Sequence, residues 1–187
     1  MGGADEGNYE QELDSHLMNT TLKEFHYKSG TKFPIFGDVQ FQREFLEAHN
    51  RIRTRHGCPS LSWCQELGDQ AQQWADKLAE KGIKLYSELP GIGENIYFCK
   101  ISDLASIPPA EDICDKWAQE ARKYDYANPG WITDAKNYSQ MVWRSTREMG
   151  VGRSVIPDKM ELIIVAFYRP GGNSNYPGDF TRNVPKP

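Results

Sequence analysis

The sequence predicts an α+β fold in which helices cover both faces of a mainly antiparallel sheet. The first two thirds of the chain carry apolar residues at helical spacings of three and four. Two apolar, β-branched segments follow, separated by a three-residue turn, and Gly or Pro marks most boundaries between segments. Helices followed by strands that meet as an antiparallel pair favour a mixed, layered architecture.

The chain divides into an extension and a body. It has 187 residues, enough for one domain and an additional segment. Residues 1–37 are polar and aperiodic, with six acidic and three basic side chains. We expect a flexible acidic extension over 1–37, pinned at its end by Phe33, Ile35 and Phe36, and a single domain over 38–187.

Composition and the first residues restrict the function. The first twenty residues hold neither a basic region nor an apolar run, so we expect no secretory signal and a cytoplasmic location. No window approaches the ~18 apolar residues of a membrane span. The net charge is -4, so nucleic acid is not an expected partner. The four cysteines match no zinc spacing, and we expect free, partly buried thiols at Cys58, Cys64, Cys99 and Cys114.

The first predicted helix begins after Asp38, which suits an N-cap, and ends at Gly57 and Pro59. One apolar stripe runs along it, formed by Phe41, Phe45, Ala48, His49 and Ile52. Cationic side chains crowd its last turns, where they suit the helix dipole, namely Arg51, Arg53, Arg55 and His56. Contact of this cluster with anionic lipid is the alternative interpretation.

Two further helices flank a predicted strand. The second helix covers about 62–81, with Gly82 as its C′ residue and an inner face of Leu67, Ala71, Trp74, Ala75 and Leu78. A loop carrying Tyr86 leads to the strand GENIYFC over 93–99. The third helix opens at 107–109, and its stripe contains Ile113, Trp117, Ala121 and Tyr124. Glu120 lies beside that stripe, where a carboxylate needs a partner.

The sequence of the last part of the body predicts a short helix and a β-hairpin. The helix covers 138–146, and strands over 149–156 and 160–169 are joined by the turn 157–159. Leu162 to Phe167 is a continuous apolar run, so we expect this strand to be central and covered on both faces. The Gly- and Pro-rich tail over 169–187 is predicted to be a loop.

Four segments give the chain a resemblance to the CAP superfamily of cysteine-rich secretory, antigen-five and pathogenesis-related proteins. They are GEN at 93–95, WAQE at 117–120, KNYSQMVW at 136–143 and FYRPGGN at 167–173, and the likeness spans about 38–183. Within the superfamily, the chain most resembles the intracellular, Golgi-associated plant pathogenesis-related type, because Phe167 stands where secreted members have Cys. The resemblance implies a three-layer α-β-α sandwich with a central, mainly antiparallel sheet.

The resemblance also implies a cleft, which many members line with two Glu and two His that bind zinc. Glu94 and Glu120 match the Glu positions, whereas Tyr86 and Asn137 occupy the His positions. Phenol and carboxamide groups are poor zinc ligands, so we expect a degenerate tetrad without metal or cofactor. Asn137 and the Tyr86 hydroxyl would hydrogen-bond the two carboxylates instead. The expected lining of a ligand cleft is His49, Tyr138, Ser139 and Trp143.

The resemblance implies a non-catalytic protein that acts by lipid, membrane or protein association. Its expected partners are anionic lipid or sterol and a second copy in a homodimer, with peripheral attachment to Golgi or other membranes. Arg144, Arg147 and Arg153 are a candidate basic patch.

Two other functions stay open. One is a weak hydrolase that uses Glu94 and Glu120 as acid and base, although Ser139 has no adjacent base to activate it. The other is a secreted-type CAP effector exported without a signal peptide, which disulfides among the four cysteines would favour.

Overall fold

The computed structural model describes residues 35–187, with side chains from residue 38 onward except at position 157. The predicted extension over 1–37 lies outside the described residues but for the backbone of its last three. The packing predicted for Phe33, Ile35 and Phe36 also concerns side chains outside that range. Within residues 35–187, no helix is both long and apolar enough to cross a bilayer.

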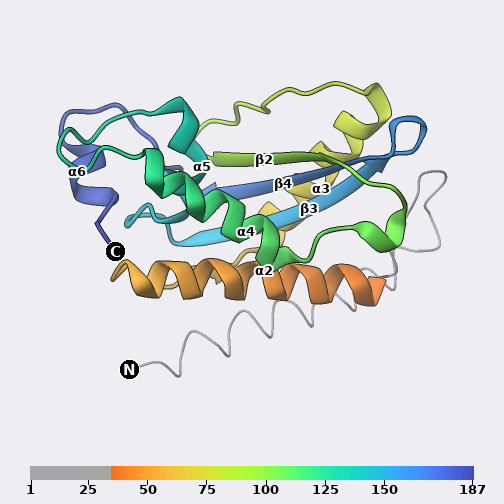
Figure 1. Cartoon of the computed structure of the whole chain (residues 1–187), viewed down its shortest axis with the longest axis horizontal. Coiled ribbons are helices and arrows are strands. Elements are labelled where there is room, and N and C mark those ends of the chain that lie inside the picture. The colour runs from red at the N-terminus through yellow and green to blue at the C-terminus, as the bar shows by residue number, and fades with distance from the viewer. Residues whose placement is uncertain (1–34) are drawn as a thin grey trace.

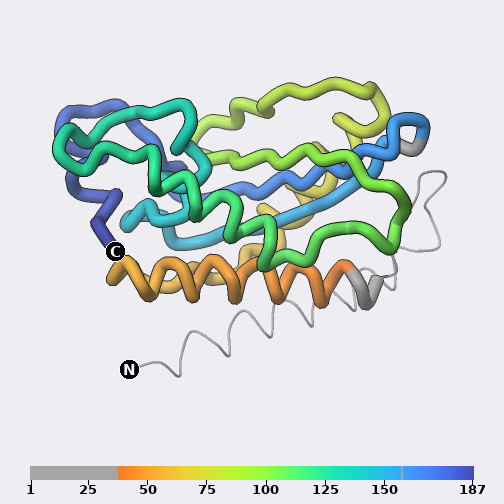
Figure 2. Tube along the Cα trace, viewed as in Figure 1, coloured from red at the N-terminus to blue at the C-terminus, as the bar shows by residue number. Residues whose placement is uncertain are grey.

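Helices and strands are interspersed along the described part of the chain. Their bounds are α2 Ile35–Arg55, β1 Ser62–Trp63, α3 Gln65–Lys81, β2 Gly93–Lys100, α4 Ala110–Gln119, α5 Lys136–Met141, β3 Glu148–Ile156, β4 Glu161–Arg169 and α6 Asp179–Asn183. Short 3-10 turns cover Leu104–Ser106, Glu120–Lys123, Thr133–Ala135 and Pro157–Lys159. Figure 2 follows the same path from α2 to the C-terminus.

The four strands form one sheet in the order β1-β3-β4-β2. β4 pairs antiparallel with both β3 and β2, whereas β1 pairs parallel with β3. The predicted hairpin and the central position of its second strand are therefore confirmed. Residues Leu162 to Phe167 are fully buried, as expected for a strand covered on both faces.

Helices cover both faces of the sheet, which confirms the predicted three-layer α-β-α sandwich. In Figure 1, α4 crosses in front of the sheet, α2 runs along its lower side, and α3 lies behind it. Alternate side chains of β4 point to opposite faces of the sheet and join two different hydrophobic cores. Leu162, Ile164 and Ala166 join the core that contains α2, α4 and α5, whereas the side chains at 163, 165 and 167 pack with α3.

Two glycines of β3 allow α3 to lie directly on the sheet. A Cβ atom at Gly150 would come within 2.1 Å of the Gly68 backbone nitrogen, and one at Gly152 within 2.4 Å of the Gln72 backbone. Because the obstructing atoms are backbone, any larger residue would push the helix away from the strand.

The outer edge of β3 is covered beyond the short strand β1. The backbone amides of Ser62 and Cys64 donate to carbonyls at 147 and 149. Farther along the same edge, Gln42 Nε2 donates to the Val151 carbonyl at 3.4 Å. The Gln72 side chain then accepts from the Arg153 amide at 3.1 Å and donates to the Arg153 carbonyl at 2.8 Å.

One prediction about α2 was wrong. The helix begins at Ile35, so Asp38 lies inside it and pairs with Arg153 Nε at 3.0 Å instead of capping the N-terminus. Arg53 lies in the last turn, as predicted, and is fully buried. Its guanidinium donates to the carbonyls of Pro59, Met141, Trp143 and Thr146 at 2.7 to 3.2 Å.

Other boundaries also differ from the expectation. Ser62 and Trp63 form β1 rather than the start of the second helix, because two residues are too few to show a strand period. The short helix α5 ends at Met141 instead of 146. The tail contains the helix α6, Asp179–Asn183, where only a loop was predicted. All four cysteines are free, and only Cys99 is partly exposed, as predicted for reduced thiols.

Candidate functional site

The four residues of the predicted tetrad come from different elements. Glu94 lies at the start of β2 and Glu120 at the end of α4, where the helix tightens into a 3-10 turn. Asn137 lies in the first turn of α5. Tyr86 lies on the connection between α3 and β2, which runs along the upper edge of the molecule outside β2 in Figure 1.

Glu120 is held by three hydrogen-bond donors of α5. Asn137 Nδ2 donates to Oε1 at 2.8 Å, as the sequence predicted. The backbone amides of Asn137 and Tyr138 donate to Oε2 at 3.0 and 3.1 Å. These amides belong to the first turn of α5, where helical N–H groups lack intrahelical partners, so Glu120 acts as a cap from outside the helix.

Glu94 is held by Ser87, a residue that the sequence analysis did not single out. The Ser87 amide and hydroxyl both donate to Glu94 Oε2, at 2.8 and 2.7 Å. The second oxygen, Oε1, is buried and has no hydrogen-bond partner within residues 35–187. Burial raises the pKa of Glu94 above its usual value, although the two Ser87 hydrogen bonds act in the opposite direction.

The Tyr86 hydroxyl does not fill the role that the sequence suggested. Its side chain is 37% exposed, and the Lys136 ammonium lies 4.7 Å from its ring centroid. Within the described part of the chain, its hydroxyl makes no hydrogen bond to Glu94 or Glu120. The adjacent residue, Ser87, donates the hydrogen bonds to Glu94 instead. A small polar side chain next to Tyr86 in the same loop was the only feature of the sequence that could have indicated this role.

His49 lies in the core instead of lining a cleft. It is fully buried, with Nδ1 2.9 Å from the Phe45 carbonyl and Nε2 2.7 Å from the Tyr168 hydroxyl. Since a carbonyl only accepts, Nδ1 carries the proton and Tyr168 donates to Nε2. Burial lowers the pKa of His49 to about 3, so the ring is neutral at physiological pH.

A hydrogen-bond chain connects this histidine to the tetrad. Asn95 Nδ2 donates to the Asn137 carbonyl at 3.0 Å and to the Tyr168 hydroxyl at 3.3 Å. Tyr168 in turn donates to His49. The chain positions α5 against β2 and β4, but it provides His49 with no open path to a substrate.

The other expected lining residues are also buried. The Tyr138 hydroxyl lies 2.9 Å from His56 Nε2 and 2.6 Å from the Tyr126 hydroxyl. Ser139 Oγ donates to Asn173 Oδ1 at 2.6 Å and makes no hydrogen bond to a histidine of residues 35–187. Trp143 is 2% exposed. This arrangement supports α5 but presents no activated nucleophile.

Residues 35–187 contain no group of three or more His, Cys, Asp or Glu side chains placed to hold a metal ion. The tetrad offers two carboxylates, a phenol and a carboxamide, and both carboxylates are already bound by protein donors. This donor set does not fit zinc, which favours imidazole and thiolate ligands.

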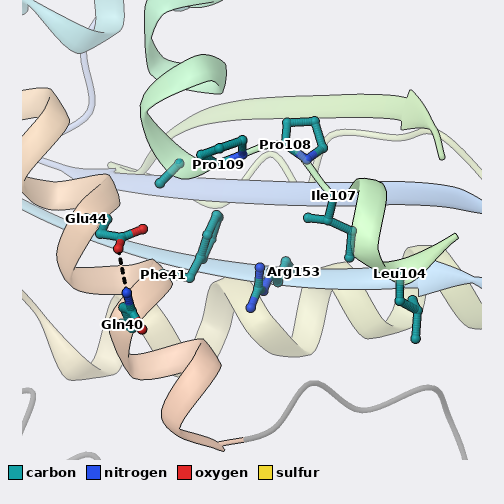
Figure 3. Close-up of a pocket in the computed structure, with 9 residues that line it drawn as sticks. Gln40, Phe41, Glu44, Leu104, Ile107, Pro108, Pro109 and Arg153 are labelled. Carbon is teal, nitrogen blue, oxygen red and sulfur yellow. Dashed lines mark hydrogen bonds between the residues drawn. The ribbon is translucent and has the colours of Figure 1, made fainter.

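Arg153 does not join Arg144 and Arg147, contrary to the suggested patch. It lines a shallow pocket of about 230 Å³ between α2 and the segment that leads into α4, and its guanidinium lies 4.3 Å from the Phe41 ring. Figure 3 shows both side chains in this pocket, opposite Ile107, Pro108 and Pro109. Most of the residues that line this pocket are apolar.

A second pocket, of about 580 Å³, contains the other two arginines. We call it the arginine pocket, and its lining residues are Trp143, Arg144, Ser145, Arg147, Gly171, Ser174, Tyr176, Asp179, Arg182 and Asn183. Arg182 comes from α6, so the helix that the sequence analysis missed supplies the third arginine.

The connection after α3 exposes several apolar side chains. Residues 83–89, which we call the 83–89 loop, hold Ile83, Leu85, Tyr86 and Leu89 with 37 to 55% of their surfaces exposed. Trp74 Nε1 donates to the Leu85 carbonyl at 3.2 Å, and Ser87 is fixed by Glu94, so the backbone of the loop is anchored while its apolar side chains face outward.

Comparison with known proteins identifies relatives over most of the chain. The model of the cysteine-rich secretory protein family matches residues 46–168. Golgi-associated plant pathogenesis-related protein 1 of Homo sapiens is 33% identical over 151 residues, which cover 79% of this chain and 94% of that protein. Repressed by EFG1 protein 1 of Candida albicans is 31% identical over 137 residues, 73% of this chain, and the chain spans only 48% of that longer protein.

A solved structure shows the same fold. Venom allergen-like protein 4 of Schistosoma mansoni superposes with a TM-score of 0.58 at 24% sequence identity, covering 79% of this chain and 96% of that chain.

Proposed function

The chain belongs to the cysteine-rich secretory protein (CAP) family, and on this premise we propose that it is a non-catalytic module that associates with anionic membrane surfaces without a metal ion. The name of its human relative, which is Golgi-associated, supports a Golgi-type membrane as the place of action. The single observation that carries the proposal is the 83–89 loop.

The 83–89 loop combines the two features of a membrane-binding surface. Leu85 is 55% exposed, and Ile83 and Leu89 are each 39% exposed, so apolar area is available to enter the interface. Exposed lysines lie at the end of α3 and in the loop itself, at Lys77, Lys81 and Lys84, and they outnumber the two exposed acidic side chains beside them, Glu80 and Glu88. Apolar side chains surrounded by lysine are typical of segments that bind anionic lipid.

The size of the two contributions predicts weak, reversible binding. Transferring a half-exposed leucine or isoleucine into an apolar environment contributes about 1 kcal/mol. A lysine near an anionic surface adds roughly 1 kcal/mol. Together, three apolar side chains and a net excess of one positive charge supply about 4 kcal/mol, which corresponds to a dissociation constant on the order of 1 mM. Lys84 contributes less than this because it also pairs with Glu161 at 2.6 Å.

The tetrad supports the non-catalytic part of the proposal. Protein donors bind Glu94 and Glu120, and Asn137 occupies one of the positions where zinc-binding relatives are expected to have histidine. General acid–base catalysis by the pair would require both carboxyl groups to face a substrate. The contacts instead hold one oxygen of Glu94 and both oxygens of Glu120 within the protein.

Co-sedimentation with vesicles tests the association. The full-length protein is mixed with phosphatidylcholine vesicles, with and without phosphatidylserine, and should sediment only with the anionic vesicles. Replacing Leu85 and Leu89 together by Ser should lower the bound fraction several-fold. Leu104→Ser is the matched control, because Leu104 is 48% exposed but lies on another segment, and it should bind as the parent does. Equal binding by the loop variant and the parent would contradict the proposal.

Native mass spectrometry tests the metal-free state and the homodimer implied by the resemblance. The mass should match the chain without zinc, and a dimer peak should appear as the protein concentration rises. One zinc ion per chain would overturn the proposal that the tetrad is degenerate.

A further inference from the structure

The arginine pocket lies at the end of the molecule where α5, the start of β3 and α6 meet, at the left in Figure 1. Its walls come from the turn after α5 and from the segment after β4. Two hydrogen bonds to Asn183 join these walls: the Arg144 amide donates to its carbonyl and the Ser145 amide to its Oδ1, both at 2.9 Å. The pocket is therefore a fixed feature of the fold and not a gap between independent loops.

Positive charge in this pocket is poorly neutralised. The Arg144 guanidinium is exposed and has no hydrogen-bond or ion-pair partner among residues 35–187. Arg147 Nη1 donates to the carbonyls of Arg144 and Thr146, at 2.6 and 3.2 Å, and pairs with no carboxylate there. The pocket contains one acidic side chain, Asp179, and it already pairs with Arg182 and accepts from Ser174.

A buried cation beneath the pocket adds to its positive potential. Arg53 bonds four carbonyls and no carboxylate, and two of those carbonyls belong to Trp143 and Thr146 in the turn that carries Arg144 and Arg147. Burial lowers the pKa of Arg53 to about 10, and Arg147 and Arg144 add to the decrease by charge repulsion. Three arginines that have no acidic partner among the described residues thus lie at one end of the molecule.

We propose that the arginine pocket binds a phosphate group, with Arg144 and Arg147 as its principal ligands. A guanidinium presents paired N–H donors that match two phosphate oxygens, and charge-assisted hydrogen bonds of this kind are stronger than neutral ones. A dianionic phosphate relieves the repulsion among Arg53, Arg144 and Arg147, which a neutral ligand does not.

The size of the pocket indicates that the phosphate carries an organic group. A volume of about 580 Å³ lies in the range of small-molecule sites and exceeds the needs of a bare phosphate ion. Tyr176 is 76% exposed at the pocket, where its ring can cover a sugar, base or glycerol group. The ligand is therefore a phosphate ester, either a soluble one or the headgroup of a phospholipid.

The phosphate site is separate from the proposed membrane contact of the 83–89 loop. An experiment can therefore refute either proposal without refuting the other. Isothermal titration calorimetry of the full-length protein with inorganic pyrophosphate, without lipid, tests the pocket directly. The parent should bind pyrophosphate, and Arg144→Gln should weaken binding roughly tenfold or more, as expected for the loss of charge-assisted hydrogen bonds. Because the Arg144 side chain has no partner within the described residues, this variant should keep the parent's melting temperature.

Arg122→Gln is the matched control, since Arg122 is an exposed arginine on the 3-10 turn Glu120–Lys123, outside the pocket. It should bind pyrophosphate as the parent does. Equal loss in Arg122→Gln and Arg144→Gln would show non-specific charge attraction and overturn the proposal.

A second experiment determines whether the bound phosphate belongs to a lipid headgroup or to a soluble ester. Vesicles containing phosphatidic acid are sedimented with the parent and with Arg144→Gln. Loss of vesicle binding in Arg144→Gln would assign the site to a lipid headgroup. Pyrophosphate binding with unchanged vesicle binding would assign it to a soluble ester. Absence of any Arg144-dependent binding in both arms would overturn the proposal.

Discussion

Asn137 Nδ2 donates a 2.8 Å hydrogen bond to Glu120 Oε1, so the carboxamide that replaces an expected zinc ligand is bound to the carboxylate next to it. The backbone amides of Asn137 and Tyr138 bind the other oxygen. Three donors therefore hold the Glu120 side chain at the junction of α4 and α5. The pair joins the end of α4 to the first turn of α5.

Replacement of Asn137 by Ala should therefore destabilise the domain. Removing the Nδ2 donor leaves Glu120 with its two backbone donors, and the lost hydrogen bond to a charged group contributes about 1–2 kcal/mol. Urea unfolding at pH 7 measures the change. Asn128→Ala is the control, because its side-chain bond to Asp125 is exposed, and it should change stability by about 0.5 kcal/mol or less. A loss in Asn137→Ala no larger than in the control would refute the interpretation.

Two histidines should convert the tetrad into a zinc site. Replacing Asn137 by His frees Glu120 Oε1, and Glu94 Oε1 already lacks a partner within residues 35–187. The structure places Ser87, rather than Tyr86, in contact with Glu94, so Ser87→His with Asn137→His is the better design. Two imidazoles and two carboxylates form a competent zinc donor set.

Calorimetry with zinc chloride measures the effect of this design. The double variant should bind one zinc ion per chain, and the parent none. Tyr86→His with Asn137→His should bind zinc more weakly, because Lys136 lies over position 86. Equal zinc binding by the parent and the Ser87/Asn137 variant would contradict both the design and the metal-free proposal.

His49 should make the protein less stable in mild acid. Its pKa is about 3 in the folded protein, against an ordinary value of 6.5, so the folded state keeps the ring neutral while the unfolded chain takes up a proton. Stability is therefore fully present above the unfolded pKa and is lost as the pH falls from 6.5 toward 3. Between pH 7.5 and pH 5, this residue should account for a loss of about 2 kcal/mol.

The measurement is urea unfolding of the parent and His49→Gln at both pH values. The variant has no imidazole at position 49, so its stability should fall less between pH 7.5 and pH 5. His56, whose pKa burial also lowers, contributes equally to both proteins and cancels in the comparison. Parallel decreases in the two proteins would show that His49 is not responsible.

Arg53 should be among the most sensitive positions of the core. Arg53→Met keeps much of the side-chain volume but leaves four carbonyls without their shared donor. The carbonyls of Trp143 and Thr146 keep another donor, whereas those of Pro59 and Met141 are left without one among the described residues. Each buried acceptor without a partner costs about 1–3 kcal/mol, so a total loss of at least about 2 kcal/mol is expected. Thermal unfolding measures it, and Arg55→Met, an exposed change in the same helical turn, should have little effect. A small loss in Arg53→Met would mean that water replaces the guanidinium.

Patterns with a clear period predicted most of the fold. The stripe of α2, the inner face of α3 and the apolar run of β4 each repeat over enough residues to define a face, and the structure places them in the core as expected. β1 and α6 were missed because two and five residues are too few to show a period. The start of α2 was misplaced because a cap residue such as Asp38 is equally suited to an ion pair inside the helix.

The site was harder to predict because its contacts join distant segments. The Asn137–Glu120 bond followed from chemical type, since a carboxamide is the natural neutral partner of a carboxylate. Ser87 and Tyr86 are neighbours in a loop without periodicity, so the sequence could not decide which of them faces Glu94. Arg53 lies about 90 residues before Arg144 and Arg147 in the sequence, and only the fold shows that it bonds the turn that carries them.

Gln42 and Gln72 have a consequence for how copies of the protein can meet. Their side chains bond the Val151 carbonyl and the Arg153 backbone on the edge of β3 that β1 leaves uncovered. An exposed strand edge is a template on which another chain can add a strand and begin to aggregate. With these backbone groups occupied, strand addition along β3 is blocked, and β2 is the sheet edge that is left for another strand to pair with.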